Sequence, residues 1–378
     1  MKNHILIFFV TYCTVVNLFS QSKTYKFSQD KWNVFNAENK IIAIDTIVYK
    51  DEHALRLKNN EIAHLQDVTF DNFRLDVDMA GVGMAGIGFR SKDLFNYEFI
   101  YFRSEASDTG NSIQYVPFYN GSTGWQLYSA PEYQLDGKFS MHNWFHVTLL
   151  VKDNDLELFI NYSQTPYMVI DLLRKDLFKG SMLLKSEFDP FYYSNLKIEK
   201  LTGGSTAKIE EKENLNHINN WLLSEQFVLN EPWAFWQSAS FLRSIKGWKS
   251  IEADKNGIVN LSRYFEYPKD AVAAKTIIIS ETNTTRQLLF DYTHTLMIIL
   301  NSEIIFYGKE MDHYGCVYDE EQKIDLSLHK GENELMFIIN GDTELYGDGI
   351  MYQGRKQSAN WGFIAKLGDY KGLVVQSK

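Results

Sequence analysis

The chain has 378 residues and a formal net charge of −10, and it is 45% hydrophobic and 15% aromatic by composition. This length is typical of two domains of ordinary size, and the hydrophobic content is sufficient for packed cores. The excess of acidic residues argues against a nucleic-acid surface, because phosphate binding needs clustered lysine and arginine. It also argues against binding to anionic membranes or acidic polysaccharides.

The first twenty residues have the pattern of an export signal. Lys2 and His4 precede an apolar run over residues 5–16, and Ser20 ends the segment. The run is short for a transmembrane helix, and polar sequence follows it. We therefore expect a secreted or periplasmic protein with no integral membrane segment after cleavage. The mature chain would keep one cysteine, Cys316, and could form no internal disulfide.

Residues 21–200 are predicted to form one all-β domain. The stretch NFRLDVDMA (72–80) alternates apolar and polar side chains, as a strand with one buried face does. Asp153-Asn154 is the expected turn between two further runs, and no helix of the length that a βαβ unit needs is present. Regularly spaced strands of this kind indicate an antiparallel sandwich or jelly roll. The other strand-like runs are 97–103, 146–151, 155–161 and 193–200.

The segment 201–220 is polar, begins at a glycine-rich turn and is predicted to be a linker. Strand-like runs resume over residues 221–378, with turns expected at Asn301-Ser302 and within HKGEN (329–333). The predicted fold class is therefore all-β, with two antiparallel β-sandwich or jelly-roll domains joined by a short polar linker.

Enzyme signatures are scarce in this sequence. It contains no HExxH, no glycine-rich phosphate loop, no GxSxG and no CxxC motif. The ExDxxE pattern of many sandwich-fold glucanases is also missing, although glycoside hydrolysis needs two carboxyl groups at a fixed separation. If the protein is an enzyme, the acid/base candidates are Asp76, Asp78 and Glu98. Otherwise Asp76 and Asp78 are expected to be solvated or ion-paired.

The stretch GIGFRSKDLFNYEFIYFR (86–103) places charges on strands rich in aromatic residues. Strand alternation predicts that Arg90 shares a face with Gly86 and Gly88, and Glu98 would stand opposite Arg90 if the two runs pair. Such a pair is either a structural ion pair or part of a clamp for a polar ligand.

The following stretch, NSIQYVPFYNGSTGWQLY (111–128), adds amides and an indole around a glycine-containing turn. Amides and carboxylates bind hydroxyl groups, and a flat indole stacks on the apolar face of a sugar ring, so these residues are candidates for a small-ligand site. His142 and His146 have no carboxylate or third histidine in evident register, and no metal site is expected from them. The predicted ligand-binding residues are Arg90, Glu98, Arg103, Gln114, Asn120 and Trp125.

Residues 65–200 resemble the concanavalin A-like lectin/glucanase superfamily through the stretches quoted above together with NWFHVTLLV and LELFIN. The likeness is to laminin-G-like jelly rolls and to the 3-keto-disaccharide hydrolase-like domains of secreted bacterial proteins. It implies that Arg90 and Glu98 line a concave sheet. It also leaves room for a calcium ion at the rim, although no oxygen-rich loop in the sequence demands one.

Residues 221–378 are similar to galactose-binding-like jelly rolls through TLMIILNSEIIFYG, IDLSLHKGENELMFIIN and NWGFIAKL. That resemblance implies a sugar-binding or packing module. Trp233 and Trp361 are expected to pack in its core.

Three functions follow as hypotheses. The leading one is a secreted protein that binds carbohydrate on the concave face of the first domain and needs no cofactor. The second is an enzyme acting on a glycosidic bond, such as a 3-keto-disaccharide hydrolase-like protein. The third is a non-catalytic extracellular interaction or scaffold protein, whose concave face would be closed by Arg–Glu pairing or covered by the second domain.

Overall fold

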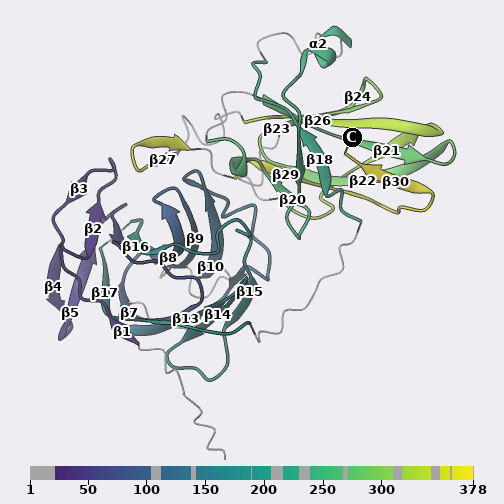
Figure 1. Cartoon of the computed structure of the whole chain (residues 1–378). Helices are drawn as coiled ribbons and strands as arrows, with labels where there is room; N and C mark the ends of the chain where they lie inside the picture. Colours follow the sequence, from purple (N-terminus) through teal and green to yellow (C-terminus); the bar gives the residue numbers. More distant parts are fainter. Residues whose placement is uncertain are drawn as a thin grey trace, which may run out of the picture.

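The computed structural model describes residues 22–103, 112–137, 142–188, 190–205, 216–229, 239–266, 271–309, 317–341, 350–357 and 360–377 (Figure 1). The expected export signal (1–20), Cys316 and Trp233 lie outside these residues, as does the middle of the expected linker. Every strand pair in the described ranges is antiparallel, and this confirms the all-β prediction.

The first half of the chain forms two sheets. The eight-stranded sheet has the order β15 (Met168–Asp171), β14 (Asp155–Ile160), β13 (Phe145–Lys152), β7 (Phe73–Gly81), β17 (Phe191–Lys200), β5 (Glu52–Leu57) and β4 (Thr46–Tyr49), and β1 (Lys23–Thr24) pairs with β17. The nine-stranded sheet has the order β11 (Ser122–Thr123), β10 (Ile113–Tyr119), β9 (Asn96–Arg103), β8 (Met84–Asp93), β16 (Ser181–Ser186), β6 (Ile62–Leu65), β2 (Trp32–Phe35) and β3 (Ile41–Ile42), and β12 (Gln134–Leu135) pairs with β10.

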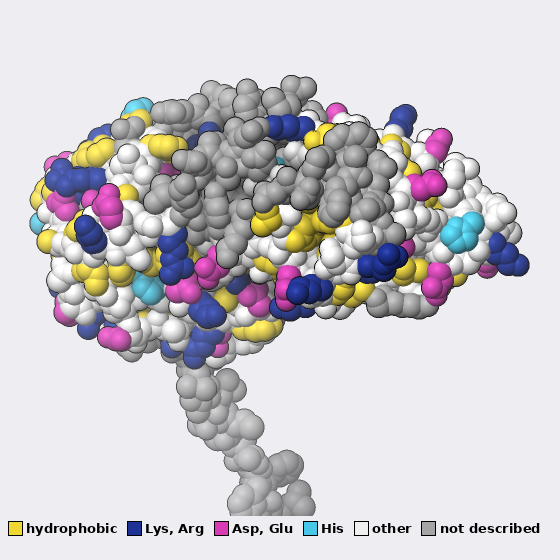
Figure 2. Space-filling view, turned by 90° about the horizontal axis from the view of Figure 1, so that it is seen from above, with side chains coloured by type: hydrophobic (Ala, Val, Ile, Leu, Met, Phe, Trp, Pro, Cys, Tyr) yellow, Lys and Arg dark blue, Asp and Glu magenta, His cyan; other side chains and the backbone are white. Residues whose placement is uncertain are grey.

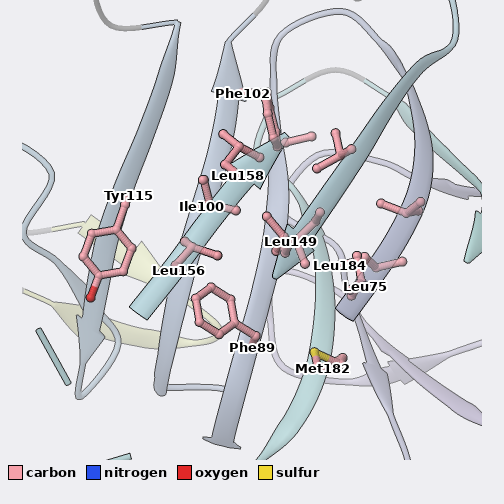
Figure 3. Close-up of a cluster of buried hydrophobic side chains, with 14 of the residues drawn as sticks. Leu75, Phe89, Ile100, Phe102, Tyr115, Leu149, Leu156, Leu158, Met182 and Leu184 are labelled. Atoms are coloured by element: carbon pink, nitrogen blue, oxygen red, sulfur yellow. The ribbon is translucent and has the colours of Figure 1, made fainter. Parts of the chain in front are cut away.

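The core of this half lies between the two sheets. Strand alternation sends every second side chain inward, so Leu75 from one sheet lies in the same buried cluster as Ile100 and Leu184 from the other (Figure 3). Aromatic rings contribute as well: Phe73 packs edge-on against Phe89, with ring centroids 5.9 Å apart. The packed sandwich is a rigid scaffold. The site described below lies on the outer face of its nine-stranded sheet.

The second half of the chain forms another pair of sheets and a small hairpin. The seven-stranded sheet has the order β19 (Lys249–Glu252), β18 (Asn220–Leu223), β21 (Ala271–Ser280), β26 (Gly331–Asn340), β23 (Thr295–Leu300) and β24 (Glu303–Lys309), and β30 (Leu373–Gln376) pairs with β21. The four-stranded sheet has the order β20 (Ile258–Asn260), β29 (Gly362–Leu367), β22 (Thr284–Tyr292) and β25 (Gln322–Leu328). The remaining elements are the hairpin β27 (Ile350–Tyr352) and β28 (Arg355–Gln357), the helix α2 (Ala239–Ser244) and the 3₁₀ turn η2 (Leu261–Arg263).

The second core is also aromatic. Trp221 packs against the rings of Phe337 and Phe363, with centroid distances of 5.2 and 5.1 Å. Trp361 is fully buried, so its expected role in core packing is confirmed.

Two of the turns expected from the sequence are present. Asp153-Asn154 connects β13 with β14, and Asn301-Ser302 connects β23 with β24. Asp153, Asn301 and Ser302 have φ between 51° and 71°, which is the left-handed conformation that tight hairpin turns require. Asparagine and aspartate tolerate this conformation better than most residues.

The two halves are joined by buried hydrogen bonds as well as by the chain. The backbone N–H of Gln126 donates to Asn360 Oδ1 at 2.8 Å, and Asn360 Nδ2 donates back to Gln126 Oε1 at 3.1 Å. Ser262 Oγ donates to Ser122 Oγ at 3.0 Å. These bonds fix the loop after β10 to the second half, because breaking them would leave buried polar groups unpaired.

The surface is mixed in charge. On the face shown in Figure 2, Lys and Arg side chains are interspersed with Asp and Glu. The helical segments within the described ranges are too short and too polar to cross a membrane.

Candidate functional site

A pocket of about 430 Å³ opens on the outer face of the nine-stranded sheet. This volume lies in the range of small-ligand sites. Its walls come from β8, β9, β10 and β16, from the loop after β10 and from the hairpin β27–β28. The lining residues are Asn59, Asn60, Met84, Phe99, Tyr101, Arg103, Val116, Phe118, Gly121, Ser122, Thr123, Trp125, Lys185, Glu187, Phe188 and Tyr352.

Strand register builds the floor of the pocket. Gly86 pairs with Tyr101 on one side and with Lys185 on the other, so these residues form one row across the sheet. A Cβ on Gly86 would lie 2.7 Å from the Phe99 ring, and one on Gly88 would collide with Leu183. The two glycines therefore make room for neighbouring side chains of the protein.

An ion pair lies among the aromatic rings of this floor. The Lys185 side chain is 2% exposed, and its ammonium group pairs with the Glu187 carboxylate. The Lys185 Nζ atom also lies 5.5, 5.0 and 4.8 Å from the ring centroids of Phe99, Phe118 and Tyr352, within the distance of cation–π attraction. The rings and the carboxylate together hold the charge in place with little access to water.

Trp125 forms a side of the pocket, and Gln114 holds it there. Gln114 Nε2 donates to the carbonyl oxygens of Trp125 at 2.6 Å and Tyr128 at 3.1 Å, and Tyr101 OH donates to Gln114 Oε1. Gln114 is buried and does not line the pocket. Gln114 therefore orients the loop that carries Trp125.

Of the other two predicted residues on this side of the protein, Arg103 lines the pocket and Asn120 does not. Arg103, the last residue of β9, lines the pocket together with Trp125. Asn120 does not line it: its Nδ2 donates to the carbonyl oxygen of Ser262 at 2.9 Å, so the side chain joins the two halves of the chain.

No family model matches the chain, and no curated protein is significantly similar to it in sequence. Among solved structures it is similar to the carbohydrate-binding module CBM66 from Bacillus subtilis, at 13% identity and a TM-score of 0.35, over 45% of this chain and 96% of the module. It is also similar to a putative glycosyl hydrolase from Parabacteroides distasonis, at 15% identity and a TM-score of 0.32, over 46% of this chain and 90% of that one. The exoplasmic/lumenal domain of VIP36, in a Ca²⁺/Man3GlcNAc-bound form, matches at 13% identity and a TM-score of 0.34, over 49% of this chain and 90% of that one. These distant likenesses cover about half of the chain.

Arg90 and Glu98 are not in the pocket, which corrects their expected place on the concave face. The register between β8 and β9 shifts after Phe89, and Arg90 has a φ of 49°. This irregularity turns the Arg90 side chain inward, where it is 1% exposed. Glu98 pairs with Phe89 and faces the core at 0% exposure.

Glu98 is held by neutral and charged partners in the interior. Tyr115 OH donates to Glu98 Oε2 at 2.6 Å, and the backbone N–H of Arg174 donates to Oε1 at 3.2 Å. Burial raises the pKa of Glu98 to about 7, against the opposing effect of Tyr115 and of the charges on Arg174 and Arg90. A group sealed in this way has no path to a substrate, so its acid/base role is not supported by the geometry.

Asp76 and Asp78 face away from the pocket, on the outer face of the eight-stranded sheet. His146 lies between them, with Nδ1 2.6 Å from Asp78 Oδ1 and Nε2 3.3 Å from Asp76 Oδ1. The register pairs His146 with Asp78, so the carboxylates that seemed absent from the histidine pattern are supplied by the neighbouring strand.

Their surroundings make these carboxylates poor proton donors. Burial alone would raise the pKa of Asp76, but hydrogen bonds from His146, Arg74 and Thr148 hold it well below its usual range. The pKa of Asp78 is also lowered: burial would raise it, but hydrogen bonds to His146 and Asn195 outweigh that effect. Asp76 and Asp78 are therefore ion-paired, which was the structural alternative to catalysis. Within the described residues, no group of three or more His, Cys, Asp or Glu side chains is arranged to hold a metal ion.

The His146 cluster predicts a pH dependence of stability. Burial alone would lower the pKa of His146, but hydrogen bonds to Asp76 and Asp78 raise it to about 9. An unfolded histidine titrates near pH ~6.5, so this stabilisation is fully present below about pH 6.5 and is lost as the pH rises through about 9. We expect the melting temperature of His146→Gln to lie below that of the wild type at acidic pH, and the gap to close at alkaline pH. The exposed His142→Gln is the control, and a gap that stays constant with pH would contradict the prediction.

Several pocket residues were not predicted from the sequence. Lys185 and Glu187 stand two residues apart in GSMLLKSEF, a spacing that places two side chains on one face of an extended chain, here at the end of β16. That spacing could have identified Lys185 and Glu187 as site residues. No feature of the sequence could have identified Tyr352, because it is more than two hundred residues away from β9 in the chain and reaches the pocket through tertiary structure alone.

Proposed function

We propose that this chain is an exported carbohydrate-binding protein and that the pocket on the nine-stranded sheet is its binding site. The observation that carries the proposal is the Lys185–Glu187 pair at the floor of an open, aromatic-lined pocket. A sugar hydroxyl both donates and accepts hydrogen bonds, so adjacent carboxylate and ammonium groups complement it. The C–H groups on a sugar ring's face complement the electron-rich faces of Trp125 and Phe99.

The same ion pair argues against an apolar ligand. Covering Lys185 and Glu187 with a hydrocarbon would remove the remaining water from two charges and give no hydrogen bond in return. A nucleic acid is not favoured either, since the chain carries a formal net charge of −10. A small polyhydroxylated ligand fits both the apolar walls and the charged floor.

The pocket supports binding over cleavage. Among its described lining residues, Glu187 is the one carboxylate, whereas glycoside hydrolysis ordinarily uses two carboxyl groups on either side of the bond. The other acidic candidates, Asp76, Asp78 and Glu98, lie on the far sheet or in the core.

A glycan array tests the proposal. We expect the wild type to retain a defined class of glycans and Trp125→Ala to lose about tenfold or more of that signal, since central aromatic contacts dominate such sites. Trp144→Ala is the matched control, because Trp144 packs against Tyr49 on the other sheet, with ring centroids 5.8 Å apart. If the folded wild type binds nothing above background, or if Trp125→Ala behaves like the wild type, the proposal is wrong.

A further inference from the structure

The hairpin β27–β28 belongs to the second half of the chain but lies against the nine-stranded sheet of the first half (Figure 1). Tyr352, at the end of β27, is 8% exposed and packs in the same apolar cluster as Tyr97, Phe118 and Leu183. The cluster covers part of the sheet's outer face. The second half of the chain therefore contributes a side chain to a face that would otherwise be open.

Tyr352 is held there by directional contacts. Its hydroxyl lies 2.7 Å from Tyr97 OH and donates to the carbonyl oxygen of Leu94 at 2.8 Å. Its ring lies 5.5 Å from Phe118 and 5.8 Å from Phe95, measured between centroids. A buried tyrosine with a satisfied hydroxyl and several aromatic neighbours has a well-defined position.

The residues next to Tyr352 anchor the hairpin on both sides. Gln353 Nε2 donates to the carbonyl oxygen of Asn60 at 3.1 Å, on the β6 side of the pocket. The Arg355 guanidinium lies 4.1 Å from the ring centroid of Phe95, on the β9 side. The hairpin thus spans the strands that form the pocket floor.

The pairing of β9 with β10 shows which part of the pocket the hairpin does not cover. Tyr97 and Phe118 form one row across β9 and β10, and Phe99 with Val116 forms the next row. Tyr352 contacts the first row, and the pocket continues along β9 over Phe99 and beyond it. Phe188, on the rim, is 59% exposed. The pocket lining is therefore exposed to solvent at Phe188 and buried at Tyr352.

The second half also helps to fix the side of the pocket that Trp125 forms. Asn360 and Ser262 bind the loop that carries Trp125, through the Gln126 and Ser122 bonds described above. The second half thus helps to position Trp125 and supplies Tyr352 itself. The pocket is a shared structure of the two halves.

We propose that Tyr352 is a specificity-determining residue of this pocket, and that it restricts the ligand to the end of a glycan chain. This inference rests on the proposed carbohydrate binding. A chain that crossed the sheet would need to leave on the side that Tyr352 occupies, and displacing Tyr352 would break its bonds to Tyr97 and Leu94. Exclusion by an occupied volume is an effective way to discriminate between related ligands.

The test is an array on which each sugar appears both at the end of a chain and within a chain, probed with the full-length protein. The wild type is expected to bind only the terminal form. Tyr352→Ala is expected to gain binding to the internal form by at least about tenfold, because the steric block has been removed. Tyr352→Phe keeps the ring and should keep the terminal preference. Tyr307→Ala, on β24 and 56% exposed, is the control in the same half of the chain.

Three outcomes would overturn the inference while leaving carbohydrate binding in place. They are wild-type binding to internal as well as terminal sugars, an unchanged preference in Tyr352→Ala, and complete loss of binding in a folded Tyr352→Ala, since Tyr352 would then hold the ligand and not limit it. Absence of any binding by the folded wild type would overturn the proposed function, and this inference with it. Thermal unfolding of each variant establishes that it is folded.

Discussion

Replacement of Arg90 by alanine is expected to lower the free energy of unfolding by about 3–5 kcal/mol. The guanidinium is 1% exposed and donates hydrogen bonds to the backbone carbonyl oxygens of Asp71 (3.0 Å from Nη2), Leu177 (3.5 Å from Nη1) and Asp153. Its charge also lies near the buried Glu98. The substitution leaves these carbonyls without their donor and Glu98 with less compensating charge, and both effects destabilise the folded state.

Urea unfolding measures this loss. Arg74→Ala is the control: Arg74 is about half exposed and pairs with Asp76 at 2.7 Å, and exposed pairs contribute only about 0–1 kcal/mol. A loss below about 1 kcal/mol for Arg90→Ala would contradict the prediction, because the buried contacts of Arg90 would then contribute no more to the free energy of unfolding than an exposed pair does.

The cost of Arg90→Ala should also depend on pH. Burial raises the pKa of Glu98 to about 7, and Arg90 opposes that rise, so removing Arg90 raises the pKa of Glu98 further. A carboxyl whose folded-state pKa exceeds its unfolded value of about 4.5 stabilises most at low pH, and the stabilisation is lost as the pH rises. The variant should therefore lose less stability at about pH 5 than at about pH 8, and this difference should disappear in a Glu98→Gln background. Equal costs at both pH values in the wild-type background would contradict the coupling.

The sequence was a good guide to the strands because their signal is local. In β7, alternation correctly places Leu75 and Val77 in the core and Asp76 and Asp78 on the outer face. Strand alternation gives the wrong face for Arg90. The same alternation placed it on the ligand face, but the chain is irregular between Phe89 and Asp93. One irregular residue reverses the face of those around it, and nothing in the local sequence marks the position.

The site was predicted less completely than the strands, for a similar reason. Trp125 and Arg103 were recognised from their local surroundings, and both line the pocket. Gln114 and Asn120 were also predicted to bind the ligand, but they do not line the pocket, and their hydrogen bonds go to the Trp125 loop and to the second half of the chain. Residue type reveals hydrogen-bonding capacity, whereas the choice of partner depends on tertiary contacts. Tyr352 is the extreme case, because the other residues that line the pocket are all distant from it in the sequence.

Glu187→Gln is expected to weaken glycan binding by about 10- to 150-fold, which corresponds to the loss of a charge-assisted hydrogen bond of about 1.5–3 kcal/mol. The amide matches the carboxylate in shape, and its oxygen can still accept a hydrogen bond from Lys185, so the pocket should keep its form. Lys185 also retains its three aromatic neighbours. We also expect a loss of stability, because the buried Lys185 ammonium keeps its aromatic neighbours but loses its counter-charge.

Titration calorimetry of the wild type and Glu187→Gln, with the glycan that gives the strongest array signal, measures this loss directly. Glu157→Gln is the matched control, because Glu157 is a half-buried glutamate on β14 of the opposite sheet. Its affinity should equal that of the wild type, and thermal unfolding of Glu187→Gln establishes that the variant used in the titration is folded. If Glu187→Gln binds as tightly as the wild type, the ion pair on the pocket floor has no contact with the ligand. The aromatic walls alone would then have to explain recognition, and a preference for polyhydroxylated over apolar ligands would lose its physical basis.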